Sequence, residues 1–230
     1  MTSFVIKLIA LASMLIDHCA LVLTPYYAPY YYVLRGVGRI AFPLYCFMIA
    51  EGFTHTRSPR RYLWRLLLFA VISQVPFAMV VSYGTGSGWA WLISELNVFF
   101  TLAAGLALIM LVSGAEKRGP GLYALIAATA ALMLCLPRSD YGFAGAALIL
   151  LLYLCRRKRI YQVGVLLIWA FWQYALAFGS FGRTQFYFAM LAALPMLLYN
   201  GRRGPGLKWL FYAFYPAHLF VLGIINIYLS

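Results

Sequence analysis

Long apolar segments recur from one end of the chain to the other, with short polar connections between them. Most are close to the roughly 20 residues that an α-helix needs to cross the hydrocarbon core of a bilayer. Lipid offers the backbone no hydrogen-bond partners, so such segments must be helical. The pattern therefore predicts an all-α, polytopic membrane bundle that forms a single domain over residues 1–230. About nine transmembrane helices are expected, at residues 4–23, 36–54, 62–82, 97–113, 121–137, 142–155, 160–178, 186–199 and 209–228.

Composition excludes an ordinary soluble protein. Of the 230 residues, 65% are hydrophobic and only 10% are charged, whereas about 25% of residues are charged in a soluble domain. The four cysteines lie within or at the ends of apolar segments, and no outer connection contains a pair. We therefore expect packing cysteines rather than a disulfide framework, and we predict no metal centre.

The positive charges lie in every second connection, and the net charge is +13. In a soluble protein this balance would suggest a nucleic-acid partner, but here the alternation follows the positive-inside rule. We therefore expect no nucleic-acid partner, a location in the cytoplasmic (inner) membrane, a cytoplasmic N-terminus and an extracytoplasmic C-terminus. The cationic connections lie at residues 55–61, 116–118, 156–159 and 202–208.

Two histidines are predicted to reach a similar depth in the membrane from different helices. His18 follows Lys7 by eleven residues, which places it about 16 Å deeper along the first helix and on roughly the same face. His218 follows Lys208 by ten residues and lies about 15 Å deep in the last helix. Asp17 points about 100° away from His18, so we expect it to meet another helix rather than to orient the histidine.

Further polar residues lie at the two ends of the predicted helices. On the outer side, Arg35 and Arg39 share one helix face, Asn97 and Asp140 open two spans, and Asp17 is a candidate ion-pair partner for Arg39. On the inner side, Glu51 and His55 are four residues apart, a spacing that allows them to pair. Several arginines surround the start of the third helix, after the Ser58-Pro59 start signal. Cations beside a helix N-terminus suit an anion such as phosphate; here they are Arg57, Arg60, Arg61 and Arg65.

Simpler interpretations exist for each feature. An intramembrane histidine can be a hydrogen-bonded packing residue, and the arginine cluster can be only a positive-inside signal. An Asp17–Arg39 pair can serve packing alone. The histidines, the arginine cluster and the Asp17–Arg39 pair occur together, and this favours a functional site. A path of polar residues from the inner cations to the midplane histidines is not needed to anchor a protein in the membrane.

These residues lie in stretches that resemble the TraX family, named for a conjugal-transfer protein that acetylates pilin. The resemblance runs in order along nearly the whole chain and is most specific in the first 77 residues. It is carried by residues 6–18, 34–43, 47–56, 65–77, 97–102, 140–142 and 210–219. The spacing from Lys7 to His18 also resembles the basic-x10-His signature of the acyltransferase 3 family.

These resemblances imply a membrane acyltransferase that moves an acyl group, in the first place acetyl, from cytoplasmic acetyl-CoA to an extracytoplasmic acceptor. The acceptor would be a protein N-terminus, a sugar or a lipid head group. His18 is the expected general base, with His218 as at most a helper. Arg39 or Asn97 would stabilise an oxyanion or orient the base, and Asp17 would hold Arg39 in place. The expected donor-binding residues are Lys7, Glu51, His55, Arg57, Arg60, Arg61, Arg65 and Lys208.

Two other classes of protein remain open. A transporter or proton-coupled carrier would use buried Asp, His and Arg residues as a relay, although the sequence shows no internal repeat of the kind common in transporters. A non-catalytic assembly protein would use the same residues only for helix packing. Binding of acetyl-CoA is the property that separates the enzyme from both.

Overall fold

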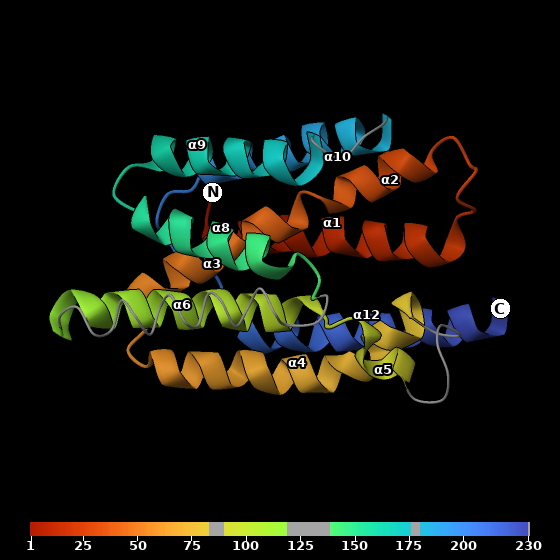
Figure 1. The fold of residues 1–230 in the computed structure, drawn as a ribbon, viewed down its shortest axis with the longest axis horizontal. Coiled ribbons are helices and arrows are strands. Elements are labelled where there is room, and N and C mark those ends of the chain that lie inside the picture. The colour runs from red at the N-terminus through yellow and green to blue at the C-terminus, as the bar shows by residue number, and fades with distance from the viewer. Residues whose placement is uncertain (83–89, 119–138, 176–179, 230) are drawn as a thin grey trace.

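The computed structural model describes residues 1–82, 90–118, 139–175 and 180–229, and within these ranges the chain is almost entirely helical. The helices align with the long axis of the molecule, and the two chain ends lie toward opposite ends of that axis (Figure 1). The elements are α1 (Ser3–Leu23), α2 (Tyr31–Gly38), α3 (Ala41–His55), α4 (Pro59–Val81), α5 (Trp91–Ser94), α6 (Val98–Arg118), α8 (Gly142–Leu154), α9 (Arg159–Ala170), η2 (Phe171–Ala175), α10 (Ser180–Leu191), α11 (Ala193–Leu197) and α12 (Lys208–Leu229).

Four helical segments in the described part of the chain are long and apolar enough to cross a membrane. They are Ser3–Leu23, Tyr31–His55, Pro59–Val81 and Trp209–Leu229. Val98–Gly114 and Gly142–Leu154 are shorter apolar helices. The predicted span at 121–137 lies outside the described residues. The prediction of an all-α bundle with membrane-spanning helices is confirmed for the described residues, whereas the number of nine spans stays a prediction.

Prolines interrupt two of the predicted spans. The span expected at 36–54 begins earlier, at Tyr31, and is broken between α2 and α3. Pro43 has no N–H to bond the carbonyl of Arg39, which is where the break falls. In the same way Pro195 leaves the carbonyl of Leu191 unpaired, and the span expected at 186–199 consists of α10 and α11.

Helix α3 lies at the centre of the bundle. In the Tyr31–His55 segment 61% of the most apolar window is buried inside the protein, against 28% to 44% for the other three candidate spans. Leu44, Cys46 and Phe47 are fully buried, and α3 packs against α1, α6 and α8. The outer helices instead expose apolar faces, including Leu68, Val71, Ile72 and Val75 on α4. An exposed apolar surface of this kind is what lipid would cover.

Helix α1 brings the predicted functional residues together because it packs against α2, α3 and α12. Contact with α12 places His18 beside His218, and contact with α2 places Asp17 beside Arg35 and Arg39. Helices α4, α6 and α12 lie on the other side of α3 in Figure 1; α4 packs against both α6 and α12, and α6 also contacts α3.

Candidate active site

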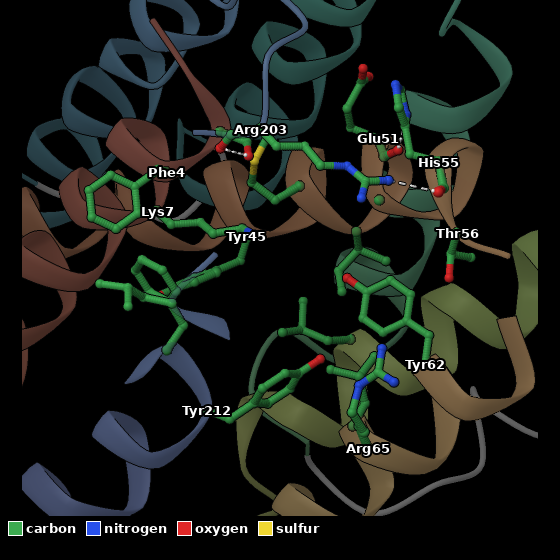
Figure 2. Close-up of a pocket in the computed structure, with 18 of the residues that line it drawn as sticks. Phe4, Lys7, Tyr45, Glu51, His55, Thr56, Tyr62, Arg65, Arg203 and Tyr212 are labelled. Atoms are coloured by element: carbon green, nitrogen blue, oxygen red, sulfur yellow. Dashed lines mark hydrogen bonds between the residues drawn. The ribbon is translucent and has the colours of Figure 1, made fainter. Parts of the chain in front are cut away.

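A cavity of about 900 Å³ lies among α1, α3, α4 and α12, at the end of the bundle that contains the α3–α4 connection. Figure 2 shows Lys7, Tyr45, Tyr62, Arg65 and Tyr212 around the open space, while the side chains of Glu51 and His55 extend away from it. The charged and histidine side chains of the lining are Lys7, Glu51, His55, Arg57, Arg65 and Arg203. With four permanent cations and one carboxylate, this inner cavity suits an anionic ligand.

Two of the cations, Lys7 and Arg65, lie beside aromatic rings. The Nζ atom of Lys7 lies 5.7 Å from the centre of the Phe211 ring, and the guanidinium carbon of Arg65 lies 5.5 Å from that of Tyr62. Neither forms an ion pair with any described residue. The Nε atom of Arg65 is buried without a hydrogen-bond partner. A buried donor without a partner costs free energy, so an anionic ligand that satisfied it would be favoured.

The expected pair between Glu51 and His55 does not form through their side chains. The Nδ1 atom of His55 lies 3.1 Å from the main-chain oxygen of Glu51, which is a local contact within the last turn of α3. The Glu51 carboxylate is instead 3.9 Å from Arg159 of α9. Most of the positive charge in the inner cavity therefore remains unpaired.

Arg203 is a lining residue that was not among the predicted site residues. The loop that carries it pairs with the start of the chain, where the Ser3 and Phe4 N–H groups donate to the carbonyls of Arg202 and Arg203 at 2.8 and 3.1 Å. Its guanidinium donates to the His55 carbonyl at 2.9 Å. Gly204 follows with a φ of +72°, and a Cβ there would approach Thr2 to 2.9 Å. The loop therefore closes one wall of the cavity.

Three predicted donor-site residues lie elsewhere or cannot be placed. Arg60 and Arg61 are exposed in the first turn of α4, outside the cavity lining. The Nε atom of Arg61 donates to the hydroxyl of Ser58, the residue that precedes Pro59 at the helix start as expected. Lys208 begins α12, but its side chain lies outside the described part of the structure.

The two histidines are in direct contact. The Nδ1 atom of His18 lies 2.7 Å from the Nε2 atom of His218, and the two rings are nearly parallel, with centroids 5.0 Å apart. The Nδ1 atom of His218 lies 2.7 Å from the main-chain oxygen of Phe214. The two histidines, which were predicted to reach a similar depth from different helices, thus lie at the same level of the bundle.

The direction of these two hydrogen bonds follows from the chemistry of the partners. A carbonyl oxygen only accepts, so the Nδ1 atom of His218 must carry a hydrogen. In the neutral ring the Nε2 atom of His218 is then an acceptor, and the hydrogen between the rings belongs to Nδ1 of His18. This leaves Nε2 of His18 with a free lone pair, which is the form that a general base requires.

Asp17 points away from this pair, as predicted, and lies between two arginines of the α2–α3 region. Its two carboxylate oxygens accept from Arg35 at 2.6 Å and from Arg39 at 2.7 Å. Arg39 also donates to the hydroxyl of Tyr141 at 3.1 Å. Gly38 permits this approach, because a Cβ there would lie 2.3 Å from the Asp17 side chain.

Asn97 does not join the histidines. Its side-chain amide donates to the carbonyl of Ala70 at 2.7 Å and to Gln74 at 2.9 Å, and its oxygen accepts from the N–H of Phe99. It therefore caps the start of α6 and ties that start to α4. The structure brings Asp17 and Arg39 close to His18, whereas Asn97 has a helix-capping role.

A second, much smaller cavity of about 40 Å³ lies beside His18. Asp17, Gly38, Phe42 and Tyr141 also line it. Four residues line both cavities, and we call them the partition: Met14, Tyr45, Val98 and Tyr215. The side chains of the partition thus border both the cationic inner cavity and the histidine site.

Comparison with known proteins gives one family and one relative for the whole chain. The family model described as TraX protein matches residues 3–226. A curated relative from Dichelobacter nodosus, described as "Probable fimbrial assembly protein FimC, serogroup H1", is 29% identical over 233 residues. The match covers 96% of this chain and 94% of the relative. No solved structure matches the chain significantly.

Proposed function

This chain belongs to the TraX family, and we propose that it is a membrane-embedded acyltransferase that moves an acetyl group from cytoplasmic acetyl-CoA to an extracytoplasmic acceptor. The observation that carries the proposal is the partition, because it joins a cationic cavity on one side to a histidine with a free lone pair on the other. A donor that enters from the cytoplasm would present its acyl group at this junction.

The inner cavity fits the chemistry of the donor. Its volume of about 900 Å³ is in the range typical of small-molecule sites, about 300–1,000 Å³. CoA carries a pyrophosphate and a 3′-phosphate, which Lys7, Arg65 and Arg203 would bind. The exposed Arg60 and Arg61 on the first turn of α4 would add positive charge near the mouth. The uncharged pantetheine arm would then extend along α1 toward the partition.

His18 would act as the general base. Its Nε2 atom takes the proton from the acceptor amine or hydroxyl while the acceptor atom attacks the thioester carbonyl. The new bond joins the acceptor to the carbonyl carbon, and the carbon–sulfur bond breaks. The proton on His18 then passes to the leaving thiolate, which departs as CoA. Arg35, Arg39 and Asp17 together carry one net positive charge beside the small cavity, which would favour negative charge on the carbonyl oxygen.

His218 would act through His18 rather than on the substrate. Its Nε2 atom accepts from His18 at 2.7 Å and holds the ring in the tautomer that exposes the basic nitrogen. When His18 takes a proton, this hydrogen bond becomes charge-assisted and strengthens. His218 is in turn oriented by the Phe214 carbonyl. It is therefore a positioning residue.

The topology that we propose has nine spans, with the N-terminus in the cytoplasm and the C-terminus outside. The alternation of cationic connections supports it, as do chain ends that lie toward opposite ends of the bundle (Figure 1). The relative described as a fimbrial assembly protein favours a fimbrial subunit, at its N-terminus or on an attached sugar, as the acceptor.

The test uses the purified full chain in proteoliposomes with acetyl-CoA labelled in the acetyl group. A peptide with the free N-terminus of a fimbrial subunit, a hexose and phosphatidylethanolamine serve as acceptors. We expect label in one acceptor, and a rise in the unfolding temperature with acetyl-CoA. If acetyl-CoA does not raise the unfolding temperature of the wild-type protein and no acceptor becomes labelled, the result would instead favour a carrier or a non-catalytic assembly protein.

A further inference from the structure

We propose that the partition and the small cavity behind it limit the donor to a two-carbon acyl group, with Met14 as the residue that sets this limit. The inference rests on the proposed function, because it concerns which acyl-CoA the same site accepts. Its starting point is the difference in size between the two cavities, about 900 Å³ on the donor side and about 40 Å³ beside His18.

The small cavity has room for very few atoms. A water-sized group needs about 10–15 Å³ of such volume, so about 40 Å³ holds about three of them. An acetyl group consists of a methyl group, a carbonyl carbon and an oxygen, and it would fill this space. No volume in this cavity then remains for additional methylene groups.

Other residues that line the small cavity are held in place by contacts of their own. Phe42 and Tyr141 stack with ring centroids 3.7 Å apart, and Arg39 holds the Tyr141 hydroxyl. Asp17 is fixed by two ion pairs, with Gly38 packed directly against it. A longer acyl chain would have to separate these charges or rings, which is costly in a packed interior.

Met14 is the adaptable residue of the partition. It lies on α1 between Lys7 and His18, it is 8% exposed, and it borders both cavities. Its unbranched side chain fills irregular space, and its loss would join the small cavity to the large one. Met48 of α3 provides a matched control, because it is similarly buried and lines the inner cavity but not the small one.

The experiment compares transfer from acetyl-CoA and from butyryl-CoA, measured as the ratio of the two kcat/KM values. One methylene group typically changes the discrimination of a pocket by about 10- to 200-fold, so the wild type should prefer acetyl-CoA. Met14→Ala should raise the relative use of butyryl-CoA about 10-fold or more. Met14→Leu, which conserves volume, and Met48→Ala should keep the wild-type ratio.

Val98→Ala opens the same partition from α6 and provides the answer should Met14→Ala not fold. An unchanged ratio in whichever of the two variants folds overturns the inference, as does an equal gain in Met48→Ala. If these variants still transfer acetyl groups but the ratio is unchanged, the size limit is wrong and the proposed function stands. A wild type that transfers no acyl group from either donor overturns both.

Discussion

Replacing the two histidines one at a time separates a base from the residue that positions it. His18→Ala removes the proton acceptor, and loss of a general base typically costs about 10²–10⁴ in rate. His218→Ala removes one hydrogen bond of 2.7 Å. Because His18 is charged after it accepts the proton, that bond is worth about 1.5–3 kcal/mol. At 1.36 kcal/mol per factor of ten, the expected loss for His218→Ala is about 10- to 100-fold.

The assay measures acetyl transfer and acetyl-CoA binding on each purified variant. Both single variants should bind acetyl-CoA as the wild type does, since neither histidine lines the donor cavity. The double variant should be no slower than His18→Ala alone, because His218 acts only through His18. His218→Gln places a carbonyl oxygen near the lost acceptor and should recover part of the activity, which a purely structural role for His218 would not predict. His55→Ala should change binding or folding rather than the transfer step.

Three results would refute this reasoning. If His218→Ala abolishes transfer while His18→Ala retains it, the base has been assigned to the wrong histidine. If the two losses multiply in the double variant, the residues act independently. If both single variants keep near-normal turnover, the histidine-base mechanism fails.

The other predictions concern the donor site, the packing around the ion pairs and the topology. The double variant Arg65→Ala/Arg203→Ala should weaken acetyl-CoA binding by about 10²- to 10⁴-fold, at about 1.5–3 kcal/mol for each of the two charged contacts, and the exposed Arg157→Ala should not; equal affinities in a binding titration would contradict this placement. Gly38→Ala should lower the free energy of unfolding by about 1–3 kcal/mol because its Cβ would meet the buried carboxylate, whereas Gly164→Ala, where a Cβ meets nothing, should not destabilise; thermal unfolding of the two variants makes the comparison. An alkaline phosphatase fused to the C-terminus should be active in a bacterial host; an inactive fusion there, with an active one in the 156–159 connection, would reverse the proposed orientation.

Much of the helical framework could be predicted from hydrophobic length and helical periodicity. The lengths of the apolar runs placed α1, α4 and α12 within a few residues of their observed bounds. The rise per residue predicted that His18 and His218 reach the same depth, and the 100° turn predicted that Asp17 leaves the face of His18. The break before α3 was encoded in Pro43, but hydrophobicity alone did not reveal it because both sides of the break are apolar.

The membership of the site was harder to predict because it depends on contacts between distant segments. Arg203 was visible only as a loop cation, and its place in the cavity follows from the pairing of its loop with residues 3 and 4. Asn97 had the chemistry of an oxyanion donor, but the neighbouring α4 carbonyl and Gln74 occupy its amide. Arg61 had the right charge and helix position, yet its side chain turns to Ser58 outside the cavity.

The sequence by itself determined that the chain is a helical membrane protein, where most helices lie and which ionisable groups reach membrane depth. These properties depend on the local chemistry of consecutive residues: apolar length, loop charge and the helical repeat. Only the tertiary structure decided which polar groups satisfy one another and which remain available to a substrate. That outcome depends on packing between helices, where a glycine at position 38 admits a carboxylate and a methionine at position 14 separates two cavities. Such contacts join residues far apart in the chain, and no local pattern encodes the distance between them.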